Sequence, residues 1–438
     1  MNNSNIFDDD MIDMGGTTQP TPQQESDSRK EEVLIVDMGT NTCDATSPSI
    51  IKVIGVGGGG GNAVNHMFKE GIGGVNFVLC NTDSKALADS PVPYRLQLGQ
   101  DGLGAGNDPE RAKKAAQESI DSIRRILSDG TKMVFITAGM GGGTGTGAAP
   151  IIAHEAKEMG ILTVGIVTIP FRFEGIKKID KALDGVDAMS KEVDALLVVN
   201  NERLREVYSE LSVLNAFEKA DDTLTVAARS IADIITMRGK MNLDFQDVCT
   251  MMRDSGVAII STGYAEGEGR VSRAIESALH SPLLNNNEFY NSKRVLLSIS
   301  FSNDGEGSDL MMDEMNEVDE FMTKFPQDVD TKWGMCIDPS LGSKVKVTIL
   351  ATGFGLSSVP GMDDHQNEDN EERAERRYRY YTNNARGGAP MRRHRIYLFD
   401  STDLANEEVI SSVEVSPTST RTKEELKAIR DKNNPNIR

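Results

Sequence analysis

The chain has 438 residues, a formal net charge of -20 and four cysteines without CxxC spacing. Its length allows two domains with sizeable cores, whereas its acidity argues against general nucleic-acid binding, which requires basic side chains to neutralise phosphates. The chain has no run of about 18 apolar residues, so no transmembrane helix is predicted. The scattered cysteines do not have the spacing of a metal site. The acidic N-terminus does not resemble a secretory signal, so we expect a cytoplasmic protein.

Predicted strands and helices alternate in the first half of the chain. Asp108 is a candidate N-cap residue, and Pro109 would then be the first residue of its helix. Apolar strands that alternate with helices indicate a parallel sheet covered on both faces. We expect strands at 51–56, 75–83, 132–138, 161–169 and 194–199, and helices at 61–71, 108–127 and 146–160.

A second, smaller α/β unit is predicted after a long helix. The helix is expected over 221–240, where Asp221 and Asp222 are candidate N-cap residues. We expect the last two strands of the unit to pair as neighbours because the connection between them is short. The predicted strands are 256–265, 294–301, 332–338 and 344–354, with an amphipathic helix at 308–325.

Composition divides the chain into structured and unstructured parts. The linker contains arginines interleaved with tyrosines at 373–395, which we interpret as a solvated spacer, with contact to an acidic surface as the alternative. The predicted parts are a disordered N-terminal extension (1–48), a first domain (49–220), a central helix (221–241), a second domain (242–356), a disordered linker (357–420) and a C-terminal tail (421–438).

Two glycine-rich segments each follow a predicted strand and open a helix. They occupy residues 55–62 and 139–150. Glycine allows the backbone to approach a ligand closely, and the N-terminal amides of the next helix attract anions. Two such segments on neighbouring strand ends would hold an extended polyphosphate from two sides.

The first glycine segment also leaves a dinucleotide enzyme open as an alternative. Gly55, Gly57 and Gly60 match G-x-G-x-x-G, and Asp83 lies near where a ribose-binding acid would stand. An NAD(P) oxidoreductase would fit these residues. The P-loop motif G-x-x-x-x-G-K-[ST] is absent, so the chain is not a P-loop enzyme.

The second glycine segment resembles a specific family signature. "GMGGGTGTG" is similar to the G-G-G-T-G-[ST]-G motif of the tubulin/FtsZ family. Further segments match bacterial FtsZ proteins in order, and the similarity covers about residues 50–355. These segments are "GVGGGGGNAV", "NTD", "GLGAGNDPE", "VTIPFRFEG", "NLDFQDV", "SPLL" and "VTILATGF".

The resemblance implies a Rossmann-like GTP-binding domain, a long central helix and a second smaller domain. It assigns Glu174 to the ribose, Lys178 to the phosphates in place of the usual arginine, and Asp221 to guanine, whose N1–H and N2–H₂ donate to a carboxylate. Asn201 corresponds to another nucleotide contact. The residues assigned to GTP are Gly57, Gly58, Gly59, Gly60, Gly61, Asn62, Gly106, Asn107, Gly141, Gly142, Gly143, Thr144, Gly145, Thr146, Glu174, Lys178, Asn201 and Asp221.

The resemblance also implies a GTPase whose site is completed by a second subunit. Asn242, Asp244 and Asp247 correspond to a loop that reaches the nucleotide of the next subunit in a head-to-tail filament, with Mg²⁺ as cofactor. The family forms the division ring at midcell, and its C-terminal tail binds membrane adaptors and division regulators. A related filament for plasmid or phage segregation is the alternative within the family.

Overall fold

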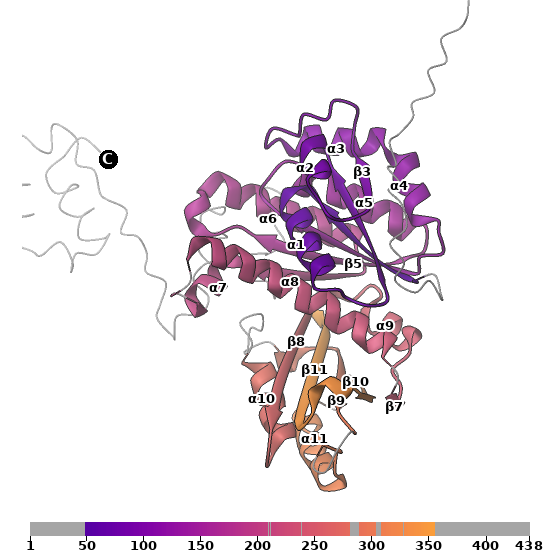
Figure 1. The fold of residues 1–438 in the computed structure, drawn as a ribbon, viewed down its shortest axis with the longest axis vertical. Coiled ribbons are helices and arrows are strands. Elements are labelled where there is room, and N and C mark those ends of the chain that lie inside the picture. The colour runs from indigo at the N-terminus through magenta and orange to yellow at the C-terminus, as the bar shows by residue number, and fades with distance from the viewer. Residues whose placement is uncertain are drawn as a thin grey trace, which may run out of the picture.

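Figure 1 shows a computed structural model of the chain, which describes residues 49–354 apart from 209, 211, 238, 281–288, 304–307 and 327. The predicted N-terminal extension, linker and C-terminal tail lie outside the described residues. Within the described part, no helix is both long and apolar enough to cross a membrane.

The first half of the chain forms the predicted parallel sheet, in the order β3-β2-β1-β4-β5-β6. Each neighbouring pair in this series is parallel. β3 was not predicted, because its four residues, YRLQ, carry no apolar run. The strands are β1 (Ile51–Val56), β2 (Val75–Asn81), β3 (Tyr94–Gln97), β4 (Met133–Gly139), β5 (Leu162–Ile169) and β6 (Ala195–Asn200).

Helices cover both faces of this sheet, as predicted. Side chains of β1 alternate between two cores: Ile51 and Val53 belong to the core shared with α1 and α8, and Ile54 and Val56 to the core shared with α5 and α6. Asp108 caps α3 and Pro109 is its first residue, as predicted. The helices are α1 (Gly57–Lys69), α2 (Ser84–Ala88), α3 (Pro109–Glu118), α4 (Ile120–Leu127), α5 (Thr144–Glu158), α6 (Ile176–Glu192) and α7 (Asn201–Val207).

The long central helix, α8 (Val213–Thr236), begins eight residues before the predicted start. Ser212 is its N-cap and accepts a hydrogen bond from the amide of Asn215 at 3.2 Å. The prediction that Asp221 or Asp222 caps this helix is therefore wrong, since both lie in its interior. Asp222 is accommodated there by Lys219, one turn earlier on the same face, at 3.3 Å.

The second half extends the same sheet beyond β6, through β8, β11, β9, β10 and β7. The predicted pairing of the last two strands is wrong, because β9 lies between β10 and β11. β9 and β11 are buried along most of their length and take central places, whereas β10 is partly exposed. The elements are β7 (Gly239–Met241), α9 (Phe245–Met252), β8 (Gly256–Glu266), α10 (Arg270–Leu279), β9 (Arg294–Phe301), α11 (Met315–Met322), β10 (Asp330–Ile337) and β11 (Lys344–Phe354), with short 3₁₀ turns at Arg172–Glu174, Phe289–Asn291, Met312–Glu314 and Pro339–Leu341.

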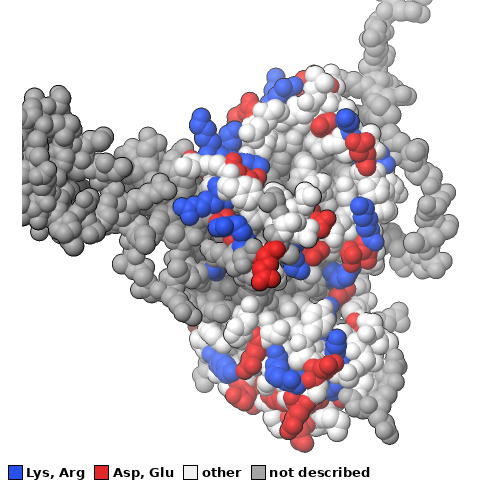
Figure 2. Space-filling view, turned by 60° about the vertical axis from the view of Figure 1, so that its left-hand side comes forward, with Lys and Arg blue, Asp and Glu red and all other residues white. Residues whose placement is uncertain are grey.

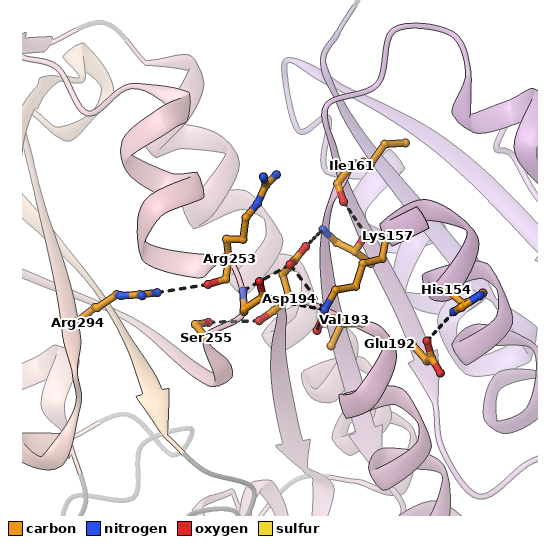
Figure 3. Close-up of polar contacts among 11 residues, drawn as sticks. His154, Lys157, Ile161, Glu192, Val193, Asp194, Arg253, Ser255 and Arg294 are labelled. Carbon is orange, nitrogen blue, oxygen red and sulfur yellow. Dashed lines mark hydrogen bonds and ion pairs between the residues drawn. The ribbon is translucent and has the colours of Figure 1, made fainter. Parts of the chain in front are cut away.

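Asp194 joins the two halves of the sheet where β6 meets β8 (Figure 3). Its buried carboxylate accepts a hydrogen bond from Thr163 N at 2.8 Å, and its carbonyl oxygen accepts one from Ser255 N at 2.8 Å. Lys157 of α5 reaches across the same junction and donates to Asp254 at 3.0 Å. These contacts fix the start of β8 against the first half of the chain.

α8 is also tied to the second half by polar contacts. The buried Lys346 of β11 donates to Asp233 of α8 at 2.9 Å, and the hydroxyls of Ser230 and Thr262 lie 3.0 Å apart. α8 therefore contacts both halves of the molecule and lies between them in Figure 1.

Candidate functional site

The two glycine-rich segments lie side by side at one edge of the parallel sheet. β1, which precedes the first, pairs with β4, which precedes the second, and Val56 lies opposite Ala138 near their carboxyl ends. The strand order reverses here: β2 and β3 follow on one side, β5 and β6 on the other. In open α/β sheets, ligands bind outside the carboxyl ends of the strands at such a switch point.

The first glycine segment is the first turn of α1. We expected the helix to begin at residue 61, but it begins at Gly57, directly after β1. The first N–H groups of a helix have no partner within it, so this turn directs unpaired donors toward the switch point.

Glycine at position 60 is required by packing. A Cβ there would lie 2.2 Å from the carbonyl oxygen of Thr137 in β4, so only glycine lets α1 lie this close to the sheet. A Cβ at Gly58 or Gly61, in contrast, would meet no atom within 4 Å. Gly58, Gly59 and Asn62 are exposed, so this turn has an open side that a ligand can reach.

The second glycine segment runs from Met140 into the first turn of α5. The Thr146 hydroxyl accepts a hydrogen bond from Gly141 N at 2.9 Å and is buried, so it holds the turn in shape. Gly142 is half-buried, and a Cβ added to it would meet no atom within 4 Å. This segment, too, has one packed side and one open side.

The two segments touch each other. A Cβ at Gly57 would lie 2.8 Å from Gly145 N, and the hydroxyls of Thr82 and Thr144 lie 2.7 Å apart. The amides of both helix starts therefore face one small volume, as expected for a polyphosphate site.

The loop at 104–107 closes one side of this volume. A Cβ at Gly143 would lie 2.8 Å from that of Ala105, so the loop lies directly against the second glycine segment. Asn107 has a left-handed backbone (φ 61°), and its carbonyl oxygen accepts a hydrogen bond from Lys181 of α6 at 2.8 Å. Gly106 and Asn107 are exposed, so a ligand can reach them.

Glu174 and Lys178, predicted to contact different parts of the nucleotide, form an ion pair with each other at 2.5 Å. The other carboxylate oxygen of Glu174 accepts a hydrogen bond from Phe171 N at 2.8 Å. The backbone of Lys178 lies against Gly141, so its side chain starts beside the second glycine segment.

Asn201 and Asp221 each have an acceptor oxygen that is open to a ligand. Asn201 is the first residue of α7 and is buried, and its Oδ1, like Thr137 Oγ1 and Ser292 Oγ, has no hydrogen-bond partner among the described residues. A buried polar atom left unpaired is costly, so Asn201 Oδ1 is a candidate acceptor for a ligand. Sequence comparison alone could not have shown this property.

The Asp221 carboxylate also has no polar partner in the described part of the chain. Partial burial, together with the charges of Asp222 and Glu218, raises the pKa of Asp221 to about 7. Asp222, by contrast, is held by His66 at 3.1 Å and by Lys219. Asp221 is therefore the carboxylate of this pair that can accept hydrogen bonds from a ligand.

The predicted catalytic residues lie elsewhere, beyond the C-terminal end of α8, where Figure 1 places β7 and α9. The amide oxygen of Asn242 accepts a hydrogen bond from Gly239 N at 2.6 Å. Asp244 is the N-cap of α9 and Asp247 completes a capping box with it. The structure brings these three residues together but does not bring them to the glycine segments.

Two basic side chains of α6, Lys178 and Lys181, lie beside the second glycine segment and the loop at 104–107. On the face shown in Figure 2, basic and acidic groups are interspersed, and acidic ones gather at the lower end of the second half. In a chain with net charge -20, an anionic ligand must therefore be bound locally, and backbone amides are the main donors at the switch point.

Comparison with known proteins identifies the family. A family profile described as "Tubulin/FtsZ family, GTPase domain" matches residues 50–209, and two FtsZ C-terminal profiles match 256–355 and 391–436. The cell division protein FtsZ of Porphyromonas gingivalis is 57% identical over 323 residues, which cover 73% of this chain and 70% of the relative. The chain belongs to the tubulin/FtsZ family.

Other FtsZ proteins agree with this assignment. The cell division protein FtsZ of Coxiella burnetii is 48% identical, over 72% of this chain and 82% of the relative. The solved FtsZ dimer from M. jannaschii aligns with a TM-score of 0.64 and 34% identity, over 72% of this chain and 90% of that one. CetZ1 from Haloferax volcanii, at 21% identity and a TM-score of 0.60, shares the fold.

The predicted family, fold and GTPase activity are therefore confirmed. The chain is an FtsZ-type GTPase of cell division, and residues 50–209 form its GTPase domain. The dinucleotide alternative is wrong: Asp83, which it would assign to a ribose, caps α2 by accepting hydrogen bonds from the amides of Lys85 and Ala86.

Sequence reasoning missed several residues that shape the site. Thr82 belongs to the matched motif "NTD", and this motif is the signal that could have pointed to its contact with Thr144. Lys181 lies one turn after Lys178 on α6, and helical spacing would have placed both on one face. Lys332, which contacts Asp247, has no such signal, because it lies on a strand 85 residues away.

Adding one methyl group should affect ligand binding on the open side of the glycine segments and stability on their packed side. Gly142→Ala should weaken GTP binding roughly tenfold while leaving stability unchanged, because its Cβ enters the ligand volume. Gly60→Ala should cost about 1–3 kcal/mol of unfolding free energy, because its Cβ collides with Thr137. Calorimetric titration with GTP measures the affinity of Gly142→Ala, and urea denaturation measures the stability of Gly60→Ala. Normal GTP affinity in Gly142→Ala would contradict GTP binding at this site.

Proposed function

We propose that GTP binds at the switch point between β1 and β4, with its phosphates on the amides at the starts of α1 and α5. The observation that carries this proposal is the open side of both glycine turns, where Gly58, Gly61 and Gly142 leave space that no protein atom fills. The helices α1 and α5 follow two adjacent strands, and the unpaired N–H groups at their N-termini supply donors from two directions. Thr144 adds a hydroxyl, and Gly106 and Asn107 border the end where the γ-phosphate would lie.

Glu174 and Lys178 would separate when the nucleotide enters. The ammonium group of Lys178 would move to a phosphate, where a charge-assisted hydrogen bond replaces the ion pair. The carboxylate of Glu174 would then accept from the ribose hydroxyls. The phosphate thus replaces the Glu174 carboxylate as the anionic partner of Lys178, so the ammonium group of Lys178 stays paired.

Guanine would be recognised by Asp221 and Asn201. The carboxylate of Asp221 can accept from N1–H and N2–H₂ of guanine together, and adenine offers no such pair of donors. Asn201 Oδ1, which has no partner among the described residues, can accept from a further nucleotide donor. A site built to pair with specific donors rejects ligands that lack them, because its own polar groups remain unsatisfied.

Mg²⁺ would arrive with the phosphates. Among the described residues, no group of three or more His, Cys, Asp or Glu side chains gathers as a protein metal site would. Mg²⁺ typically keeps several waters and is bound through substrate phosphates, and it would neutralise charge during phosphoryl transfer.

The acidic loop of one subunit would act on the GTP of the next. Asn242, Asp244 and Asp247 lie beyond the end of α8 that is far from the glycine segments, and α8 is about 36 Å long at 1.5 Å per residue. They therefore cannot reach the nucleotide of their own subunit. Head-to-tail stacking would bring them to the neighbour's γ-phosphate, where carboxylates can orient and polarise the attacking water.

This arrangement would couple hydrolysis to assembly. GTP would lie in the contact between subunits and favour the filament, and loss of the γ-phosphate would weaken that contact. The relatives are cell division proteins, so we propose that the filaments form a cytoplasmic ring at the septum. The tail, residues 421–438, would bind membrane adaptors and division regulators. The FtsZ C-terminal profile that matches residues 391–436 covers most of this tail.

Asp221 should make GTP binding depend on pH. With a pKa of about 7, the carboxyl is protonated below neutrality and must release its proton to accept from guanine. GTP affinity should therefore be constant above pH 7 and fall by up to about tenfold per pH unit below it. Calorimetry between pH 5.5 and 8 measures this fall and the proton released.

Asp221→Asn is the matched control, because the phosphates of GTP titrate identically with both proteins. The variant should bind GTP more weakly at pH 8 and lose the additional pH dependence. If both proteins lost affinity in parallel as the pH fell, Asp221 would not contact guanine.

Catalysis across subunits predicts complementation between two defective variants. Asp244→Ala should bind GTP normally but hydrolyse it at least roughly tenfold more slowly and form longer-lived polymers. Gly142→Ala binds GTP poorly but keeps an intact acidic loop. A mixture should release phosphate faster than the sum of its parts, because Gly142→Ala subunits supply loops to GTP held by Asp244→Ala subunits. Strictly additive rates would refute a shared site.

A further inference from the structure

Lys332 of β10 contacts one carboxylate of the acidic loop and not the other. Its ammonium group donates to Asp247 Oδ1 in a short ion pair. No family resemblance drew attention to this lysine. It is separated from Asp247 by 85 residues, and β10 brings it there by pairing with both β9 and β7.

The contact makes the two acids unequal. Asp247 uses both oxygens within its own subunit: Oδ2 accepts from Asp244 N at 3.1 Å, and Oδ1 accepts from Lys332. Asp244 uses only Oδ1, which accepts from Asp247 N at 2.8 Å. Its Oδ2 has no hydrogen-bond partner in the described part of the chain, and Asp244 is exposed. The pair therefore presents one free carboxylate oxygen to a neighbouring subunit.

Lys332 also supplies the positive charge beside this acidic group. The charges that act on it are those of Asp247, Asp330 and Asp244. The hydrogen bond from Lys332 lowers the pKa of Asp247 and the same contact raises the pKa of Lys332, so the two charged forms stabilise each other. The nearest basic group on β9, Arg294, is directed instead to the carbonyl oxygen of Arg253 at 3.3 Å.

We propose that Lys332 is a positioning residue for GTP hydrolysis: it fixes the Asp247 carboxylate in the capping box so that Asp244 keeps its free oxygen directed at the next subunit's nucleotide. This inference rests on the proposed action of the acidic loop across the subunit contact. Both acids keep their place at the next subunit's nucleotide. Asp244 offers its free oxygen there, and Asp247, held by Lys332, also keeps the loop in shape.

Removing the ammonium group has two consequences. Asp247 Oδ1 loses its partner, so the carboxylate can rotate out of the capping box and Asp244 loses its fixed orientation. The pKa of Asp247, which the Lys332 contact lowers, would return only toward its ordinary value of 3.8, so the carboxylate stays ionised near neutral pH. The substitution therefore acts through the orientation of the loop and not through its protonation.

The test measures kcat and KM for steady-state GTP hydrolysis by the full chain above its assembly threshold. Lys332→Met and Lys332→Gln remove the charge, and Lys332→Arg keeps it. Lys344→Met is the matched control for loss of one positive charge, because Lys344 is exposed and lies at the start of β11 opposite Glu266 of β8. GTP affinity and urea unfolding are measured for each variant.

The proposal predicts that Lys332→Met and Lys332→Gln lower kcat roughly three- to tenfold, with unchanged KM and GTP affinity. Lys332→Arg should restore most of the rate, and Lys344→Met should hydrolyse GTP normally. If the Lys332–Asp247 ion pair served stability alone, its loss would lower the unfolding free energy without changing kcat, and that result would overturn the proposal.

Two further outcomes separate this inference from the proposed function. If Asp247→Ala abolishes hydrolysis while Lys332→Met and Lys332→Gln behave like the wild type, the acidic loop acts as proposed and only the role of Lys332 is wrong. If Asp247→Ala itself hydrolyses GTP at the normal rate, the catalytic assignment of the loop fails, and the role of Lys332 fails with it.

Discussion

Unpaired backbone amides at the starts of α1 and α5 are the feature on which the rest of this structure depends. They meet because β1 and β4 are neighbours at the point where the strand order reverses. The close approach that brings them together requires glycine at position 60, where any side chain would strike β4. A polyphosphate is the ligand such donors suit, even in a chain with a net charge of -20, because the attraction is local.

The same constraint would explain why the proposed site needs a second subunit. The amides at the starts of α1 and α5 would hold the phosphates at one end of the molecule, whereas the acidic loop lies beyond the far end of α8. The ion pair of Lys346 with Asp233 and the junction at Asp194 tie α8 and β8 to their neighbours. In the proposed function, hydrolysis and assembly would therefore be linked by this distance.

The sequence predicted the parallel sheet, the ends of two strands as the candidate ligand site, and the family, because apolar strands and glycine motifs are local signals. It could not predict features set by distant contacts. The helix expected over 108–127 breaks at Ser119, whose hydroxyl accepts a hydrogen bond from Gly99 N. β9 (RVLLSISF) separates the last two strands, because its more apolar sequence suits a central place better than that of β10 (DTKWGMCI). The ion pairs of Glu174 and Asp247, and the unpaired oxygen of Asn201, likewise depend on three-dimensional packing.

GTP hydrolysis per subunit, measured against protein concentration with light scattering in parallel, tests the central claim most directly. A site shared between two subunits predicts that the rate per subunit is close to zero at low concentration and rises steeply where scattering shows assembly. A rate per subunit that stayed constant across the assembly threshold would show that each subunit hydrolyses GTP alone, and would contradict the account.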